Sequence, residues 1–286
     1  MIDLYDAILA RRSVRMYERT PLPEPLLDEV RTAVEGVSAL SPELPFSCAV
    51  QAVAEGDDIV SAMGGYGRLL SIPHVLVPAI GDGPNSLIDF GYRVEQLVVR
   101  LTQLGLGTCW LGALTHRASV VARFGPAEGT TIAAIVAFGR TAQNTASRAV
   151  NSAIRSVVGA NRKKRVQEFT WRDTVGSPAA LTELESKVLE ALRASPSTGN
   201  AQPWCVVLSG GLLFLGVRTD ARYYRLSGNV GYDQVDAGIG MANVSLAIEA
   251  LKHPSRWQLL LNDATERDRL GLAENVRLVA SVQLKG

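Results

Sequence analysis

The sequence of 286 residues has few of the residue types that build metal centres and disulfide frameworks. It contains three histidines and three cysteines. Cys48, Cys109 and Cys205 are dispersed and odd in number, so they form neither a zinc-ligand spacing nor a disulfide pattern. This cysteine usage is typical of a reducing compartment. The histidines stand far apart without a serine or carboxylate signature, which gives no support for a serine hydrolase or a metal site.

An excess of charge of one sign and long hydrophobic runs are also lacking. The formal net charge is +1, which gives no electrostatic reason to expect binding to nucleic acid or to an anionic membrane. The longest apolar stretches, 69–80 and 132–138, are interrupted or too short to span a bilayer. The first six residues carry acids where a signal peptide needs bases. We therefore expect a soluble cytoplasmic protein.

The composition is that of a globular chain, with 47% hydrophobic and 20% charged residues. Apolar periodicity predicts both helices and strands. The glycine-rich stretch 107–112 is predicted to be a loop, and 147–165 a connector. Helices are predicted over the first dozen residues, 26–37, 59–70, 87–104, a short segment to 124, 181–192 and 235–251. Strands are predicted at 46–53, 74–80, 131–139, 204–208, 212–217 and 278–284.

The second half of the chain repeats the order of elements of the first half. Pro45-Phe46 opens a strand in one half, and Pro203-Trp204 opens a strand in the other. Asp89-Phe-Gly91 and Asp236-Ala-Gly238 lie at the start of the two long predicted helices. The two offsets differ slightly, and α/β chains can show such echoes by chance. The pattern nevertheless favours an internal duplication.

Two stretches could bind a ligand. Ala194-Ser-Pro-Ser-Thr-Gly-Asn-Ala-Gln-Pro-Trp204 follows a predicted helix that Pro196 ends, and its short polar side chains could hold a planar ligand. An ordinary helix-to-strand loop is the alternative. Arg11-Arg-Ser-Val-Arg15 offers guanidinium groups and a hydroxyl suited to a phosphate. Its alternative is a solvated basic helix end placed favourably on the helix dipole.

These stretches carry a resemblance to a known family. Arg11 to Arg15, followed by Tyr17, resembles the N-terminal signature of the nitroreductase family of FMN-dependent oxidoreductases. The stretch 194–204 is similar to the second signature of that family. The stretch Leu104-Gly-Leu-Gly-Thr-Cys-Trp-Leu-Gly112 resembles the third, and 162–165 resembles the basic stretch that closes the phosphate pocket. The four stretches together span most of the chain.

The order of the signatures departs from the family pattern. Family members carry the second signature one helix after the first, but 39–46 lacks the asparagine and the glutamine. The region 171–178 of the second half lacks an Arg-Arg-Ser signature. The sequence is thus similar to the fused, duplicated nitroreductases of the Thermotoga type.

This resemblance implies an α+β, nitroreductase-like fold with central mixed β-sheets flanked by helices. The fold would be internally duplicated as an intramolecular pseudo-dimer. Residues 1–170 would form the half with the phosphate motif and 171–286 the diverged second half, packed as one unit. The protein would act as a monomer, with one FMN per chain and the second site lost.

The resemblance also implies roles for single residues, all of them in binding, because the flavin would carry the redox step. The FMN phosphate would be held by Arg11, Ser13, Arg15, Lys163 and Arg165, with Arg12 beside the ring or the ribityl chain. The ribityl and pyrimidine side would contact Pro196, Ser197, Thr198, Asn200 and Gln202. Backbone near flavin N5 would come from Trp110, Leu111, Gly112 and Ala113. Tyr223 and Tyr224 could line the substrate side or serve only in packing, and Trp204 is expected in the core.

The implied reaction is hydride transfer from NAD(P)H through flavin N5 to a small-molecule acceptor such as a nitroaromatic or a quinone. Two alternatives stay open. The same fold could catalyse a different flavin reaction, as dehalogenating or flavin-fragmenting relatives do. The chain could instead be a non-enzymatic FMN binder or scaffold whose duplicated site has decayed.

Overall fold

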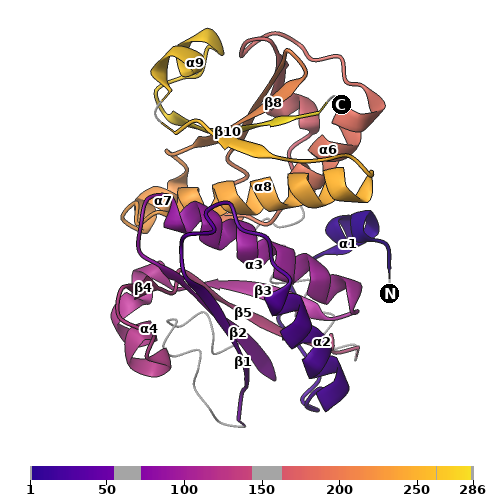
Figure 1. The fold of residues 1–286 in the computed structure, drawn as a ribbon, viewed down its shortest axis with the longest axis vertical. Helices are drawn as coiled ribbons and strands as arrows, with labels where there is room; N and C mark the ends of the chain where they lie inside the picture. The colour runs from indigo at the N-terminus through magenta and orange to yellow at the C-terminus, as the bar shows by residue number, and fades with distance from the viewer. Residues whose placement is uncertain (1, 55–71, 144–162, 262, 285–286) are drawn as a thin grey trace.

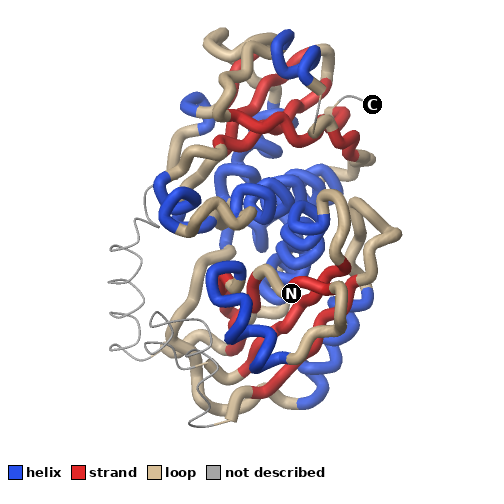
Figure 2. Tube along the Cα trace, turned by 90° about the vertical axis from the view of Figure 1, so that its left-hand side faces the viewer, coloured by secondary structure: helices blue, strands red, loops and turns tan. Residues whose placement is uncertain are grey.

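Two β-sheets enclose a layer of helices in the computed structural model (Figure 1). The structure describes residues 2–54, 72–143, 163–261 and 263–284. Figure 2 shows the same arrangement from the side, with helices between the strands of the two sheets. The mixed helix-and-sheet architecture predicted from the sequence is confirmed.

The first sheet is antiparallel, and its strands follow the order β1-β2-β5-β3, with β4 paired to β2. The second sheet has the order β6-β7-β8-β10-β9, and only β6 and β7 are parallel. The strands of the first sheet are β1 (Phe46–Ala52), β2 (His74–Gly81), β3 (Gly107–Gly112), β4 (Thr130–Thr131) and β5 (Ala134–Gly139). Those of the second sheet are β6 (Thr170–Arg172), β7 (Trp204–Ser209), β8 (Leu212–Arg218), β9 (Trp257–Leu259) and β10 (Val276–Gln283).

The two sheets repeat one topology. In each repeat, two antiparallel strands come first in sequence and are followed by a long helix. The last strand of the repeat then lies between this strand pair and the edge strand: β5 lies between β2 and β3, and β10 lies between β8 and β9. The order β7-β8-β10-β9 thus matches β1-β2-β5-β3. This repetition confirms the internal duplication. The boundary predicted between residues 170 and 171 falls inside β6, and the division into those two halves stays a prediction.

The two long helices, α3 (Ser86–Gln103) and α8 (Tyr232–Ala250), cross at the centre of the molecule (Figure 1). A Cβ on Gly91 would overlap the carbonyl oxygen of Val235, and a Cβ on Gly238 would overlap that of Ile88. Glycine is required at both positions because each backbone lies against the other. The two contacts are the same contact repeated in the two halves, as an approximate twofold axis through the crossing requires.

Each long helix also covers one sheet with its apolar side. Val94 and Leu97 of α3 pack in a core that includes Leu76 of β2. Met241 and Val244 of α8 belong to a second core under the second sheet. Burial of such side chains contributes roughly 1.5–3 kcal/mol each. The helical layer therefore holds both sheets.

Helix α1 (Leu4–Ala10) lies against both long helices and against α6 (Glu183–Ala194). Leu4 and Ile8 pack with Val99 of α3, Ala191 of α6 and Leu246 of α8. This packing fixes where the chain leaves α1. The remaining helices are α2 (Glu24–Glu35), α4 (Arg117–Phe124), α7 (Arg222–Leu226) and α9 (Ala264–Arg269), with 3₁₀ turns at Leu114–His116, Val166–Glu168 and Thr198–Asn200.

The structure corrects some of the predicted elements. Residues 107–112 form strand β3, because Thr108 to Leu111 pair with β5 although glycines flank them. The run 131–139 is divided between β4 and β5, and β6, β9, α7 and α9 were not predicted. The helix predicted at 59–70 and most of the connector at 147–165 lie outside the described residues. Within the described ranges, no helix has the length and apolar character needed to cross a membrane.

Candidate functional site

Arg11 joins the first signature to the second. It caps the C-terminus of α1, and its side chain is 7% exposed. Its Nη2 donates a hydrogen bond of 3.4 Å to the carbonyl oxygen of Ala194, which ends α6. Its Nε lies 3.9 Å from Glu95 Oε1. Burial lowers the pKa of Arg11, and the Glu95 carboxylate opposes this shift.

Lys163 reaches the next residue of the second signature. Its Nζ donates a hydrogen bond of 2.6 Å to the carbonyl oxygen of Ser195. Burial, followed by repulsion from Arg11, lowers the pKa of Lys163 to about 7. Two of the basic residues predicted to bind the FMN phosphate therefore meet at the C-terminal end of α6. The contact of Arg11 with Ala194 brings together the two stretches that the resemblance implies are close.

The other residues predicted to lie near the FMN phosphate or ring have different surroundings. Arg12 Nη1 donates to the carbonyl oxygens of Leu9 (3.3 Å) and Ala10 (2.8 Å) and thus caps α1, as the alternative interpretation predicted. Ser13 forms a bridge to Thr108 at the start of β3. Arg15 is buried, with 6% exposed. The side chain of Arg165 is 81% exposed and lies 3.4 Å from Glu168.

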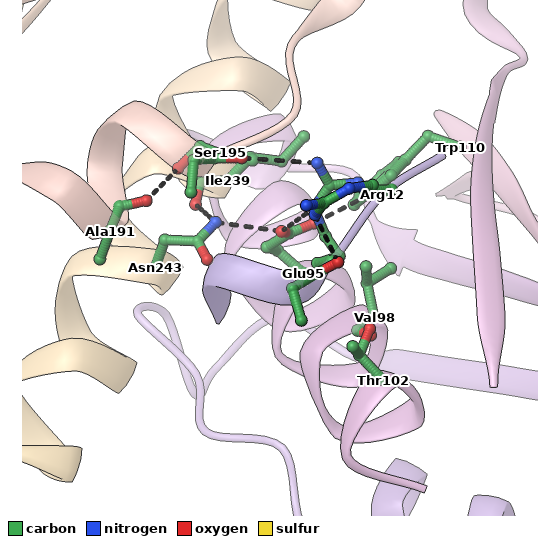
Figure 3. A network of polar contacts seen from close by, with 12 residues as sticks. Arg12, Glu95, Val98, Thr102, Trp110, Ala191, Ser195, Ile239 and Asn243 are labelled. Carbon is green, nitrogen blue, oxygen red and sulfur yellow. Dashed lines mark hydrogen bonds and ion pairs between the residues drawn. The ribbon is translucent and has the colours of Figure 1, made fainter. Parts of the chain in front are cut away.

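Glu95 connects the first signature to the third. This fully buried carboxylate accepts hydrogen bonds from Trp110 Nε1 (2.9 Å) and from Asn243 Nδ2 (3.0 Å). Figure 3 shows Glu95 between these two side chains. Burial raises the pKa of Glu95, against the opposing effect of Arg11. Glu95 thus places β3 and α8 relative to the end of α1.

The second signature forms a tight turn with left-handed backbone at Gly199 (φ 58°), Asn200 (φ 53°) and Gln202 (φ 46°). Ser197 Oγ accepts a hydrogen bond of 2.9 Å from the backbone N–H of Gln202. The side-chain oxygen of Gln202 accepts one of 2.8 Å from the N–H of Lys164. These contacts fix the turn in a defined shape.

Asp236 of α8 holds the same turn through hydrogen bonds to Thr198. It accepts hydrogen bonds from the N–H (3.0 Å) and Oγ1 (2.9 Å) of Thr198. Its other side-chain partner is Tyr224, whose hydroxyl donates over 2.5 Å. Burial raises the pKa of Asp236 to about 7 and also raises the pKa of Tyr224. Tyr224 is therefore a buried packing residue that faces the interior.

Tyr223 and Tyr232 connect the second signature to the third through contacts with one glycine of each. A Cβ on Gly199 would lie 2.8 Å from the ring of Tyr223, and one on Gly112 would lie 2.6 Å from the hydroxyl of Tyr232. The two rings meet edge to face, with their centroids 6.2 Å apart. Tyr223 is 44% exposed. The predicted pyrimidine and N5 sides of the site are thus joined by an aromatic pair.

The backbone of the third signature is only partly available to a ligand. Gly112 is exposed, whereas Leu111 is buried and the N–H of Ala113 donates to Ala133. Trp204 is 1% exposed and lies in the core, as predicted. The sequence analysis assigned no site role to several residues that organise the site, which are Glu95, Lys164, Tyr232, Asp236 and Asn243. Lys164 lies in the basic stretch 162–165, and Glu95 and Asp236 are acids within the apolar patterns of the two long helices, but local sequence did not reveal their partners.

Comparison with known proteins identifies the family of the chain. Residues 3–248 match the family model described as "Putative TM nitroreductase". A solved structure of a putative nitroreductase from Thermotoga maritima matches with a TM-score of 0.59 and 19% identity, over 100% of this chain and 95% of the other. The chain therefore belongs to this nitroreductase family and has its fold.

Other solved structures match about half of the chain. Nitroreductase A from Vibrio parahaemolyticus matches with a TM-score of 0.45 and 20% identity, over 50% of this chain and 70% of the other. The NADPH:FMN oxidoreductase from Vibrio harveyi, complexed with NAD⁺, matches with a TM-score of 0.44 and 20% identity, over 49% and 70%. A comparison with curated protein sequences gave no match.

Proposed function

We propose that this protein is an FMN-dependent NAD(P)H oxidoreductase of the nitroreductase type that reduces a small electron-poor aromatic compound, such as a nitroaromatic or a quinone. The observation that carries this proposal is the meeting of Arg11 and Lys163 with Ala194 and Ser195. It brings the phosphate signature of one half to the ring signature of the other.

The basic cluster suits a phosphate group. Arg11 is buried and Lys163 is half-buried, and burial of charge is costly unless the charge is paired. Among the described residues, Arg11 Nε has no hydrogen-bond partner, and its ion pair with Glu95 is long. A phosphate would accept hydrogen bonds from both cations and compensate their charge. Ser13 and Arg15 would complete the cluster, and Arg12 and Arg165 would join it by leaving their present partners.

The second and third signatures would hold the flavin ring system. Pro196, Ser197, Thr198, Asn200 and Gln202 would orient its ribityl and pyrimidine side through the turn that Asp236 anchors. The exposed backbone of Gly112, with Trp110, Leu111 and Ala113, would face the opposite edge. The flavin would accept a hydride from NAD(P)H and pass the electrons to the acceptor. Tyr223 would offer a flat aromatic surface to that acceptor.

The first half supports the proposal of one site per chain. Its counterpart of the second-signature turn is 39–46, where Asp89 accepts a hydrogen bond of 2.8 Å from the N–H of Leu40. Arg93 Nη2 donates to the carbonyl oxygens of Ser41 (2.8 Å) and Leu44 (3.3 Å). The guanidinium also lies 5.1 Å from the centroid of Phe46. The counterpart of Arg93 in α8 is Gly240, so the arginine would close the second site of the pseudo-dimer.

Cofactor content and turnover test this function. The purified protein is expected to be yellow, with FMN bleached by NADH or NADPH and re-oxidised by a nitroaromatic. FMN that neither nucleotide reduces would instead indicate a binder or another flavin reaction. A colourless protein that FMN cannot reconstitute would contradict the proposal.

A further inference from the structure

Asp236 bonds the second signature and Tyr224 through several polar contacts. Its side chain is fully buried near the start of α8. It accepts from both the N–H and the hydroxyl of Thr198 and from the hydroxyl of Tyr224. An ionised carboxylate is an acceptor only, and these three donors offset part of the cost of its burial.

The duplication offers a natural comparison for this contact set. Asp89 stands at the same position of α3 and accepts from the backbone N–H of Leu40, just as Asp236 accepts from Thr198. The second partner differs between the halves. Asp89 binds Arg93 of its own helix (2.9 and 2.7 Å), whereas Asp236 binds Tyr224 of α7. Among the described residues, Asp236 therefore ties its turn to a further helix, whereas Asp89 bonds a residue of its own helix.

Tyr224 carries this coupling to the exposed aromatic residue. The neighbouring Tyr223 lies against Gly199 and meets the ring of Tyr232. Helix α7 is only five residues long, and a helix this short depends on tertiary contacts for its stability. The bond from Tyr224 to Asp236 thus fixes α7 and, with it, the position of Tyr223 over the turn.

We propose that Asp236 and Tyr224 are positioning residues that hold the Thr198–Gln202 turn and α7 together, so that the flavin site and its acceptor side keep one arrangement. This inference rests on the proposed function, because the turn and Tyr223 are assigned to FMN and acceptor through it. Neither Asp236 nor Tyr224 needs to touch the flavin. They act through Thr198 and Tyr223.

Three variants separate the parts of this role. Asp236→Ala removes all three acceptor contacts, and we expect FMN affinity to fall at least about tenfold, which is about 1.4 kcal/mol. Asp236→Asn keeps an oxygen for Thr198 and should restore most of that affinity. Tyr224→Phe leaves Thr198 anchored, so we expect FMN affinity to stay within about threefold while the KM for the acceptor rises and kcat changes little.

Tyr92→Phe is the matched control. It also deletes a buried tyrosine hydroxyl, bonded to Ser245 over 3.2 Å, but outside the site. It should cost similar stability and leave FMN affinity and the acceptor KM unchanged. If Asp236→Ala does not fold, Tyr224→Phe and Thr198→Val can be combined, and coupling through Asp236 predicts that their effects on FMN affinity and acceptor KM are not additive.

The outcomes distinguish this inference from the proposed function. Wild-type protein that binds no FMN contradicts the function itself. Wild-type protein that binds FMN, with Asp236→Ala binding equally well and Tyr224→Phe showing the acceptor KM of Tyr92→Phe, overturns the positioning role and leaves the function intact. Additive effects in the double variant would also overturn it.

Discussion

Arg11 and Ala194 are joined by a hydrogen bond from the guanidinium Nη2 to the carbonyl oxygen, although they belong to opposite halves of the chain. The contact exists because α1 packs on α3, α8 and α6 at once, so the end of α1 meets the end of α6. Lys163 reinforces it by binding Ser195. The candidate site is thus composed from both repeats.

The charge state of Lys163 predicts how FMN binding depends on pH. Its pKa of about 7 would rise when a phosphate binds, so above about pH 7 binding must take up a proton. We expect FMN affinity to fall as the pH rises from about 7 to about 9, where the phosphate stays a dianion with its own pKa near about 6. Fluorescence titration of FMN measures this affinity.

Lys163→Met provides the control for this pH dependence. It should bind FMN more weakly and without the decline above about pH 7, because the titrating group is gone. An equal slope in the wild type and in this variant would assign the pH dependence to another group.

The helix crossing predicts a large difference between two glycine substitutions. Gly238→Ala forces a methyl group into the backbone of α3 and should lower the free energy of unfolding by about 3 kcal/mol or more. Gly36→Ala is the matched control, since its new Cβ would lie 3.6 Å from the nearest oxygen at an ordinary φ of −89°. It should change stability by less than about 1 kcal/mol. Urea denaturation compares the two, and equal losses would contradict the crossing.

Arg93 predicts a change in stability without a change in cofactor binding. Arg93→Ala leaves Asp89 as a buried carboxylate without its cation, which should cost about 3–5 kcal/mol. FMN affinity at the composite site should stay within about twofold. Chemical denaturation and FMN titration test the two parts, and Arg93→Lys serves if the alanine variant does not fold. A strong loss of FMN affinity would instead place the cofactor at the first-half turn 39–46.

Asp236 predicts a pH-dependent difference in stability between the wild type and Asp236→Asn. Folding raises the pKa of this carboxyl from 3.8 to about 7, chiefly by burial. Below about pH 4 the carboxyl is protonated in both the folded and the unfolded wild type, so its titration does not affect the free energy of unfolding. Between about pH 4 and about pH 7 the free energy of unfolding of the wild type falls relative to that of the variant, and above about pH 7 the difference stays constant. Denaturation at several pH values measures this difference. If the stability difference between the wild type and the variant does not grow with pH, burial does not raise the pKa of Asp236.

The sequence predicted much of the fold because its long helices and hairpins carry clear local patterns. The resemblance also predicted that the stretches at Arg11 and Ala194 would meet. Strand β3 was predicted as a loop because glycines flank it, whereas its pairing with β5 is a long-range property. The roles of Glu95 and Asp236 depend on partners such as Trp110 and Thr198, and local sequence does not reveal such partners.

Cofactor stoichiometry combined with two substitutions tests the composite site most directly. We predict one FMN per chain in the wild type, with Arg11→Ala and Asn200→Ala each weakening that same site at least about tenfold, since one would remove the proposed phosphate ligand and the other the proposed ring ligand. Titration of each purified variant with FMN gives both the number of sites and the affinity. Two FMN per chain, or a loss of affinity in only one of the two variants, would contradict a single site built from both halves.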